Sequence, residues 1–269
     1  MNFHFEHSAR GVGWPANRRG FTLIELLASL AIIALLSLIT VPMIKHAMHS
    51  ARGSLSASNL RNWGTAFHYS LVDSEGWMPS RGPGEQPSWI QVSNYDDIEA
   101  REAWYNLLPP YVREMNLSAI EATGDPDGAL LKDRTIHRDP MAKLQRAQLE
   151  QRPVFSYSMN ERLNTSLAHG DIVPGQGDLR AAILRFSMYE EPTSTVLLFE
   201  SRVNEEDGQT QGDNTQYGRA YGDQQHISFR RGETVQALFL DGSVRKYESA
   251  TVYAADPDAQ DVVRWSGLP

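Results

Sequence analysis

The sequence predicts an α+β protein in which one long N-terminal helix carries a smaller antiparallel-sheet domain. This expectation rests on an apolar run near the N-terminus, an amphipathic helical pattern after it, and short strand-like segments separated by loops in the rest of the chain. The chain has 269 residues, a formal charge of −8 and no cysteine. Its length suits one or two domains, and the lack of cysteine excludes disulfides and cysteine-ligated metal centres.

The apolar run covers residues 21–44, where Glu25 is the single ionisable side chain. A helix needs about 20 apolar residues to cross a membrane, so we expect this run to span one. Residues 1–20 hold three arginines and one acid, whereas the remaining residues hold 22 basic and 32 acidic side chains. Basic flanks favour the cytoplasmic side, which places the acidic body on the far side. An acidic body does not favour nucleic-acid binding.

After the apolar run the helical pattern continues as an amphipathic stripe. Apolar residues recur at spacings of four, three and four from Ile44 through Met48 and Ala51 to Leu55, and Leu60, Trp63, Phe67 and Leu71 continue the stripe. This spacing predicts a helix with one face packed on a domain. Residues 73–76 (Asp-Ser-Glu-Gly) and Pro79 signal its end, so we expect one helix over residues 22–74.

A short motif precedes the apolar run: residues 18–25 read Arg-Arg-Gly-Phe-Thr-Leu-Ile-Glu. The motif resembles the signature of type IV prepilins and type II secretion pseudopilins, in which a basic leader ends in glycine before an apolar helix. The resemblance implies that a prepilin peptidase cuts between Gly20 and Phe21 and methylates the new amino group of Phe21. It also implies an assembly role for Glu25. Pro42 would kink the helix, because proline removes a helix hydrogen bond.

The same resemblance implies a pilin-like fold and a structural rather than an enzymatic function. The chain would comprise a cytoplasmic leader (1–20), a transmembrane helix (21–44), an amphipathic spine helix (45–75) and a periplasmic α+β head (76–269). The subunit would be a single-pass protein of the bacterial inner membrane until an assembly platform and its ATPase added it to a helical homo- or hetero-filament. Whether that filament is a secretion pseudopilus, a pilus or a DNA-uptake filament stays open, as does the rank of major or minor subunit.

The head carries weaker signals for its secondary structure. We expect a helix over residues 96–108, strands over residues 154–159 and 195–200, and a hairpin over residues 233–247. The dipeptide Asp241-Gly242 is typical of a two-residue hairpin turn.

The head also resembles a large-head subset of pseudopilin-like proteins. Its matching pieces are residues 104–111, residues 156–160, and a late histidine before an Asp-Gly turn, here His226 and Asp241. Many of those relatives have Cys-Pro where residues 139–140 read Asp-Pro. These matches are less specific than the N-terminal motif, and they indicate kinship of the head rather than a reaction.

Two alternatives to a structural subunit stay open. A minor-pilin adhesin would bind a glycan or another extracellular ligand, and a membrane-tethered enzyme would use His226 with Asp241. The enzyme alternative lacks a nucleophile or a third ligand, and a strand start and a turn are the preferred interpretation of the two residues. The adhesin alternative relies on a sugar-stacking surface of tryptophans, although packing against the spine helix is the preferred interpretation. These tryptophans are Trp63, Trp77, Trp89 and Trp104.

No cofactor is expected, with one weak exception. Residues 204–213 are acidic and contain two glycines, so Glu205, Asp207 and Asp213 are candidate oxygen ligands for calcium. Their spacing does not fit an EF-hand loop. A solvated acidic loop is therefore the preferred interpretation.

Overall fold

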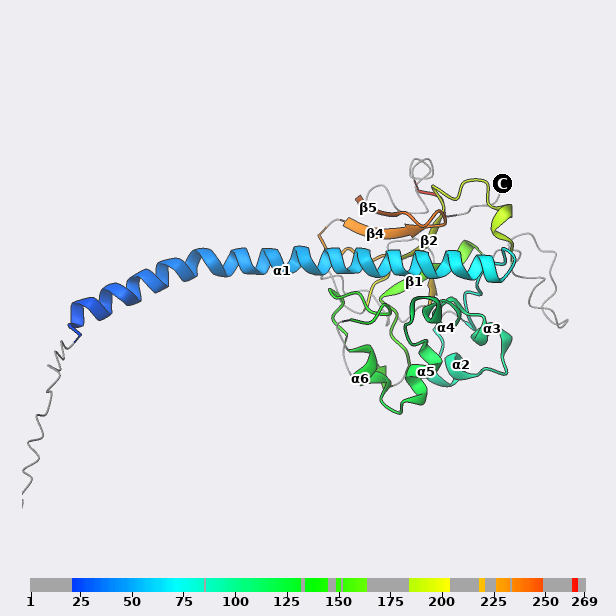
Figure 1. Cartoon of the computed structure of the whole chain (residues 1–269), viewed down its shortest axis with the longest axis horizontal. Coiled ribbons are helices and arrows are strands. Elements are labelled where there is room, and N and C mark those ends of the chain that lie inside the picture. Colours follow the sequence, from blue (N-terminus) through cyan, green and yellow to red (C-terminus); the bar gives the residue numbers. More distant parts are fainter. Residues whose placement is uncertain are drawn as a thin grey trace, which may run out of the picture. The chain divides into compact units, whose positions relative to one another are not determined.

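In the computed structural model, the chain divides into two units, Met1–Met48 and His49–Pro269. The structure describes residues 21–84, 86–131, 134–144, 149–150, 152–163, 184–203, 218–220, 226–232, 234–248 and 263–265. Helix α1 (Leu23–Asp73) begins in the first unit and ends in the second (Figure 1). Its bounds agree with the helix expected over residues 22–74 to within one residue at each end.

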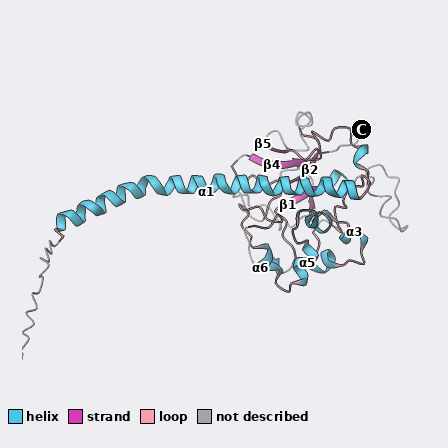
Figure 2. Cartoon of the chain, viewed as in Figure 1, coloured by secondary structure: helices cyan, strands magenta, loops and turns pink. Residues whose placement is uncertain are grey.

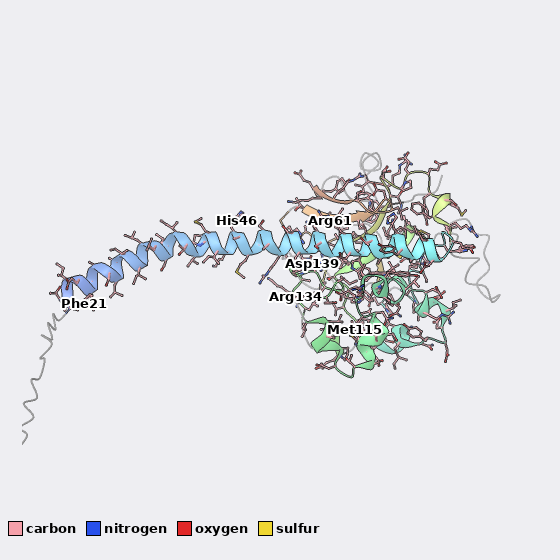
Figure 3. The ribbon with its side chains drawn as sticks, in the orientation of Figure 1. Phe21, His46, Arg61, Met115, Arg134 and Asp139 are labelled. Carbon is pink, nitrogen blue, oxygen red and sulfur yellow. The ribbon has the colours of Figure 1, made fainter. Side chains whose placement is uncertain are left out.

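The first unit consists, in its described part, of the N-terminal half of α1. Every residue from 21 to 52 is exposed. Figure 3 shows the side chains of this half, from Phe21 onward, projecting from the helix on all sides. Within the described part of the chain, α1 is the one helix long and apolar enough to cross a membrane.

In the second unit, α1 buries one face against the head. The buried residues of α1 are Ser56, Asn59, Leu60, Trp63, Gly64, Ala66, Phe67, Ser70 and Leu71. They include the expected stripe from Leu60 to Leu71, whereas Ile44, Met48 and Leu55 are exposed. Packing of α1 on the head therefore begins near Ser56.

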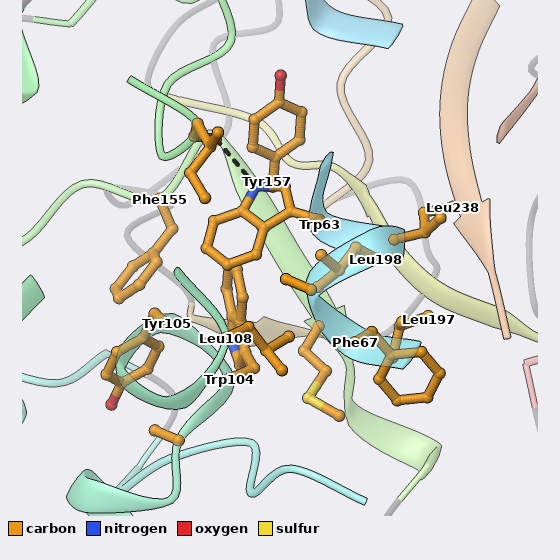
Figure 4. Close-up of a cluster of buried hydrophobic side chains, with 14 of the residues drawn as sticks. Trp63, Phe67, Trp104, Tyr105, Leu108, Phe155, Tyr157, Leu197, Leu198 and Leu238 are labelled. Carbon is orange, nitrogen blue, oxygen red and sulfur yellow. Dashed lines mark hydrogen bonds between the residues drawn. The ribbon is translucent and has the colours of Figure 1, made fainter. Parts of the chain in front are cut away.

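The core beneath α1 is rich in aromatic rings. Trp63 lies edge-on to Trp104, with ring centroids 4.9 Å apart, and Tyr157, Phe155 and Leu198 surround the pair (Figure 4). Trp63 also donates a hydrogen bond from Nε1 to the carbonyl of Ile136 at 2.9 Å. Edge-to-face rings with a satisfied indole N–H give α1 a fixed position on the head.

Helix α1 ends where the sequence signals predict. The amide of Gly76 donates to the carbonyl of Leu71 at 2.7 Å, and Gly76 has a φ of +87°. Glu75, directly before it, also has a positive φ of +58°, so two successive left-handed residues close the helix, and glycine adopts this conformation without steric cost.

Several short helices lie between α1 and the sheet along the chain (Figure 1). They are α2 (Trp89–Ser93), α3 (Ile98–Arg101), α4 (Trp104–Leu107), the 3-10 helix η1 (Pro109–Val112), α5 (Leu117–Ala122) and α6 (Pro126–Leu130), and a further 3-10 helix, η4 (Phe186–Met188), precedes β2. The expectation of one helix over residues 96–108 is wrong, because Ser80 pairs with the backbone in its middle. Its amide donates to the carbonyl of Glu102 and its carbonyl accepts from the amide of Trp104, each at 2.8 Å.

The sheet has the strand order β3-β1-β2-β4-β5. Figure 2 shows its strands in magenta, with β1, β2, β4 and β5 labelled. Its strands are β1 (Tyr157–Asn160), β2 (Val196–Glu200), β3 (Arg219–Ala220), β4 (Thr234–Phe239) and β5 (Val244–Glu248). Neighbouring strands are antiparallel except for β3, which runs parallel to β1 at the edge. The α+β fold class with an antiparallel-sheet head is confirmed. The strand expected over residues 154–159 begins three residues later, at Tyr157.

Both faces of the sheet are buried at β1 and β2, and a bulge decides which residues of β2 face α1. Leu197 and Leu198 belong to the core beneath α1, whereas Val196 and Phe199 belong to a second core with Trp265. The pairing of β2 with β4 shifts between Val196 and Leu198. One extra residue reverses the alternation of a strand, so Glu200 lies on the α1 side of the sheet.

The hairpin of β4 and β5 is confirmed, but its turn differs from the expected one. The amide of Gly242 donates to the carbonyl of Phe239, and the amide of Phe239 donates to the carbonyl of Ser243, both at 2.9 Å. Gly242 has a φ of +82°, whereas Asp241 does not have a positive φ. This is a three-residue loop, a type I turn followed by a glycine bulge, rather than a two-residue turn.

Candidate functional site

The N-terminus of α1 is closed by its own side chains. The backbone amide of Thr22 donates to Glu25 Oε2 at 2.9 Å, and Thr22 Oγ1 donates to the same oxygen at 2.8 Å. The amide of Glu25 in turn donates to Thr22 Oγ1 at 3.3 Å. This reciprocal arrangement is a capping box, which satisfies helix amides that have no partner inside the helix. Sequence reasoning missed it, although the Thr-x-x-Glu pattern before an apolar run was there to be read.

The capping box places a carboxylate next to the expected processing site. Phe21 is 81% exposed and directly precedes Thr22. Gly20 lies outside the described residues. Glu25 is therefore held by Thr22 within the single chain, four residues from the position at which the sequence predicts a new amino terminus.

The polar side chains within the apolar run are satisfied by the helix itself. Ser29, Ser37 and Thr40 donate their hydroxyl hydrogens to backbone carbonyls three or four residues earlier, at 2.7–2.8 Å. In lipid, each unsatisfied polar group costs several kcal/mol, so these bonds suit the run to an apolar environment. Helix α1 continues through Pro42 without interruption, and the kink expected there stays a prediction.

Two of the head residues singled out in the sequence have structural roles. Asp241 Oδ1 accepts hydrogen bonds from the amide and the hydroxyl of Ser243, at 2.8 and 2.6 Å, which stabilises the hairpin turn. The carbonyl of His226 accepts from the amide of Arg202 at 2.8 Å, and the next residue, Ile227, bridges Ser201 in an antiparallel pair. Asp241 therefore has the expected turn role, whereas the strand expected to begin at His226 is reduced, in the described residues, to an isolated bridge at Ile227.

Tryptophan packing also follows the preferred interpretation. Trp63, Trp89 and Trp104 are buried. The indole nitrogens of Trp89 and Trp104 donate to the carbonyls of Leu149 and Gly218, at 2.6 and 2.9 Å. Trp77 is partly buried, and the guanidinium carbon of Arg185 lies 4.6 Å from its ring centroid. Three of the four rings are thus part of the core and do not present a sugar-stacking surface.

The candidate calcium ligands Glu205, Asp207 and Asp213 lie outside the described residues. Within the described part of the chain, no group of three or more histidine, aspartate or glutamate side chains is placed to hold a metal ion.

Sequence reasoning did not find a buried ion cluster beneath α1, formed by Asp139, Glu200, Arg230 and Arg231. The two carboxylates are fully buried, and the arginine side chains are 4% and 5% exposed. Arg231 donates to Glu200 Oε1 at 2.6 Å and lies 3.5 Å from Asp139 Oδ1, while Arg230 Nε lies 3.4 Å from Asp139 Oδ2. Two positive and two negative groups make the cluster formally neutral.

The buried ion cluster connects α1 to the sheet. Ser56 Oγ on α1 donates to Glu200 Oε1 at 2.8 Å and lies 2.8 Å from the hydroxyl of Tyr157 on β1. The amide of Gln236 on β4 donates to Glu200 Oε2 at 3.0 Å. The amide of Asp139 donates to Ser156 Oγ at 2.6 Å. Burying charge is costly unless each group is paired, and here carboxylates, guanidinium groups and hydroxyls from segments far apart in the sequence are paired.

Burial shifts the pKa values of three buried groups in the head, Glu200, Tyr157 and His137. Burial raises the pKa of Glu200, and the charge of Asp139 raises it further, whereas Arg231 and Arg230 oppose this. Burial also raises the pKa of Tyr157. Burial lowers the pKa of His137 to about 4, although a hydrogen bond to the carbonyl of Met115 opposes the shift. His137 is therefore neutral near pH 7.

Comparison with known families gives one match. A family model described as the prokaryotic N-terminal methylation motif matches residues 15–41. The chain carries a prokaryotic N-terminal methylation motif. The matched residues include Gly20, Phe21, Thr22 and Glu25, and they continue into the exposed apolar half of α1. The methylation motif covers about a tenth of the chain, and the head lies outside it.

No curated protein and no solved structure matches the chain significantly. The methylation motif supports kinship with pilins and pseudopilins and a pilin-like substrate of prepilin peptidase. An apolar helix near the N-terminus fits a single membrane anchor in such a protein.

Proposed function

We propose that the protein is a structural subunit of a type II secretion pseudopilus or of a related type IV pilus-like filament. Prepilin peptidase cuts between Gly20 and Phe21 and methylates Phe21, and the mature subunit begins with the apolar half of α1. The observation that carries this proposal is the methylation motif at residues 15–41, which joins the cleavage signal to the helix that follows.

The exposure of the N-terminal half of α1 supports a protein that works within an assembly. All residues from 21 to 52 are exposed, although most of residues 21–44 are apolar. Burial of apolar surface stabilises by about 25 cal/mol per Å², so this half of the helix needs lipid or neighbouring helices around it. We place it in the inner membrane before assembly and among the helices of other subunits afterwards, with the head in the periplasm. The platform protein and the ATPase act on this inserted form.

Glu25 has a defined task in this proposal. In a bundle of apolar helices an unpaired carboxylate is strongly destabilising, whereas a paired one costs far less. The α-amino group of Phe21 on an adjoining subunit is the cation of suitable reach, and methylation leaves it charged. In the single chain Glu25 accepts from Thr22 instead, so assembly exchanges or extends this contact.

The head gives the alternatives little support. An adhesin would need an exposed binding surface, and three of its four candidate tryptophans are buried. An enzyme would need groups converging on His226, whereas Asp241 is bound into the hairpin turn. A structural subunit needs neither feature.

Processing is the direct test of the proposed function. Mass spectrometry of the membrane-extracted protein should find a chain that begins with N-methylated Phe21. Gly20→Leu should retain the leader, because a side chain at the cleaved position blocks the peptidase. Gly13→Leu, in the same leader, is the matched control and should be cleaved normally. A native protein that begins at Met1, or one cut after Ile44, would refute the proposal.

Assembly tests the role of Glu25. Glu25→Ala should still be inserted and cleaved but should enter filaments roughly tenfold less well when coexpressed with the wild type, since its partner amine is left buried without a counter-charge. Thr22→Val removes the capping hydroxyl and keeps the carboxylate, so it should assemble better than Glu25→Ala. Equal defects in the two variants would reduce Glu25 to a helix cap, and normal incorporation of Glu25→Ala would remove its assembly role.

A further inference from the structure

The charges along α1 are distributed unevenly. After Glu25 the next acidic residue is Asp73, and the residues between them include lysine, arginine and histidine but no carboxylate. The cations are Lys45, Arg52 and Arg61. The chain as a whole carries a formal charge of −8, so this part of α1 is a basic segment in an acidic protein.

The basic residues nearest the apolar run are fully available to a ligand. Lys45 directly follows the run, and Lys45, His49 and Arg52 are spaced by four and three residues, which places them on one side of an α-helix. All residues from 45 to 52 are exposed. The side chains of Lys45, His46, His49 and Arg52 make no hydrogen bond or ion pair with other residues that the structure describes.

The position of residues 45–52 along the helix matches the headgroup layer of a bilayer. The 24 residues of the apolar run extend about 36 Å at 1.5 Å per residue, enough for a hydrocarbon core of about 30 Å. The next eight residues extend about 12 Å further. Polar headgroups occupy roughly 5–8 Å on each side, so Lys45 begins in this layer and Arg52 reaches back to it with its long side chain.

We propose that residues 45–52 bind anionic lipid headgroups in the leaflet on the head side of the membrane, with Lys45 and Arg52 as the principal contacts. The inference rests on the proposed function in one respect. Cleavage after Gly20 removes Arg10, Arg18 and Arg19, so Lys45 and Arg52 are then the side-chain cations nearest the membrane. A basic residue near an anionic surface contributes about 1 kcal/mol, roughly a fivefold preference. This attraction opposes the repulsion between the acidic body and the same surface.

An acidic surface on a second copy of the chain is the competing occupant. Lipid is favoured because Lys45 is adjacent to the apolar run, so the segment reaches headgroups whenever the run is in the bilayer. Contact with a second copy would require assembly.

The test uses the full chain in vesicles of phosphatidylcholine and phosphatidylglycerol. Because the chain has no cysteine, Ser50→Cys supplies a single thiol for a fluorescent label within the segment. Quenching by phosphatidylglycerol with a spin label high on its acyl chain is compared with quenching by phosphatidylcholine labelled at the same carbon. With Lys45 and Arg52 present, phosphatidylglycerol should be enriched about fivefold near the label at low salt. This enrichment should fall toward unity at high salt.

Matched variants distinguish a specific effect of Lys45 and Arg52 from a general effect of positive charge on α1. Lys45→Gln with Arg52→Gln should abolish the enrichment, whereas Arg61→Gln, nine residues further along the exposed face of α1, should leave it unchanged. Equal quenching by the two lipids, or an equal loss in Arg61→Gln, would overturn the proposal. Self-quenching between labelled copies that disappears in the double variant, without lipid enrichment, would assign the segment to a second copy and would also overturn it.

A second label separates this inference from the proposed function. Ala31→Cys places the same probe within the apolar run, where lipids labelled deep in their acyl chains should quench it. Failure there would refute the membrane anchor itself. Normal insertion and normal processing after Gly20, without enrichment at residue 50, would refute the lipid site alone.

Discussion

The two halves of α1 differ in where their partners come from. From residue 21 to residue 52 every side chain is exposed, whereas from Ser56 to Leu71 one face is buried in the head. Both halves are regular helix. One continuous helix therefore contains a part whose packing is complete within the chain and a part whose packing has to be supplied by lipid or by other subunits.

The match to the family model is confined to the exposed half of α1 and the residues just before it. The methylation motif covers residues 15–41, in which the described side chains are exposed, while the buried half of α1 and the head lie outside it. An exposed segment that must fit a peptidase and neighbouring helices is constrained residue by residue. A buried helix face needs only apolar side chains of suitable size, which many sequences provide.

Truncation should separate the two halves of α1 most clearly. A fragment that starts at His49 should fold and stay in solution, because it keeps the buried face of α1 and loses the apolar run. A fragment that starts at Glu75 should not fold, since it lacks Trp63, Phe67 and Leu71 of the core. Circular dichroism and tryptophan fluorescence would distinguish the two outcomes. A folded fragment without α1 would show that the helix is an accessory to the head.

Two substitutions on α1 test which face of the helix is packed against the head. Trp63→Ala should lower the free energy of unfolding by about 3–5 kcal/mol, because it removes a fully buried ring and leaves a cavity. Tyr69→Ala is the matched control, on the same helix but 57% exposed, and should change it by less than about 0.5 kcal/mol. Urea denaturation of the fragment starting at His49 would measure both. Similar costs at the two positions would contradict the assigned packing face.

Much of the fold could be predicted from local patterns. The bounds of α1 followed from the apolar run, the stripe of Leu60, Trp63, Phe67 and Leu71, and the stop signal near Gly76. The hairpin of β4 and β5 followed from one Asp-Gly pair between apolar stretches. In each case the decisive residues are close in sequence, so their spacing alone carries the information.

The type of the hairpin turn and the capping box were not predicted from the sequence. Asp-Gly indicated a two-residue turn, but only Gly242 takes a positive φ, and the loop has three residues. The choice depends on how β4 and β5 are registered, which the dipeptide does not determine. The capping box of Thr22 and Glu25, by contrast, was visible in four residues and was overlooked.

The buried ion cluster could not be predicted because its members are far apart in sequence. Asp139, Glu200 and Arg231 come together only when β2 pairs with β4 and a bulge turns Glu200 toward α1. An isolated charged residue in a sequence is expected at the surface. The cluster can be recognised only when the pairing of β2 with β4 is known.

The buried ion cluster offers a test of intermediate size. Arg231→Met should lower the free energy of unfolding by about 3 kcal/mol, because Glu200 and Asp139 are left with one buried cation between them. Adding Glu200→Leu restores a neutral cluster of Asp139 and Arg230, so the double variant should be more stable than Arg231→Met alone. Strict additivity of the two costs, measured by urea denaturation, would show that the charges are not coupled.

The last prediction concerns pH and has the smallest effect near neutrality. His137 has its pKa lowered to about 4 in the folded head, whereas an unfolded histidine titrates near 6.5. Between these values the unfolded chain binds a proton that the folded chain does not, so stability is full above pH 6.5 and is lost as the pH falls. Between pH 7 and pH 5 the loss should be about 2 kcal/mol.

The variant His137→Gln isolates this contribution. Its amide can still donate to the carbonyl of Met115, which lies 2.7 Å from His137 Nε2, but it does not titrate. Glu200 acts in the opposite direction, because its raised pKa favours the folded state as the pH falls, and it is present in both proteins. Subtracting the variant's pH profile from that of the wild type therefore leaves the histidine alone. A difference that stays constant between pH 7 and pH 5 would mean that His137 reaches solvent in the folded state, and the core beneath Trp63 would then be open where the packing of α1 requires it to be closed.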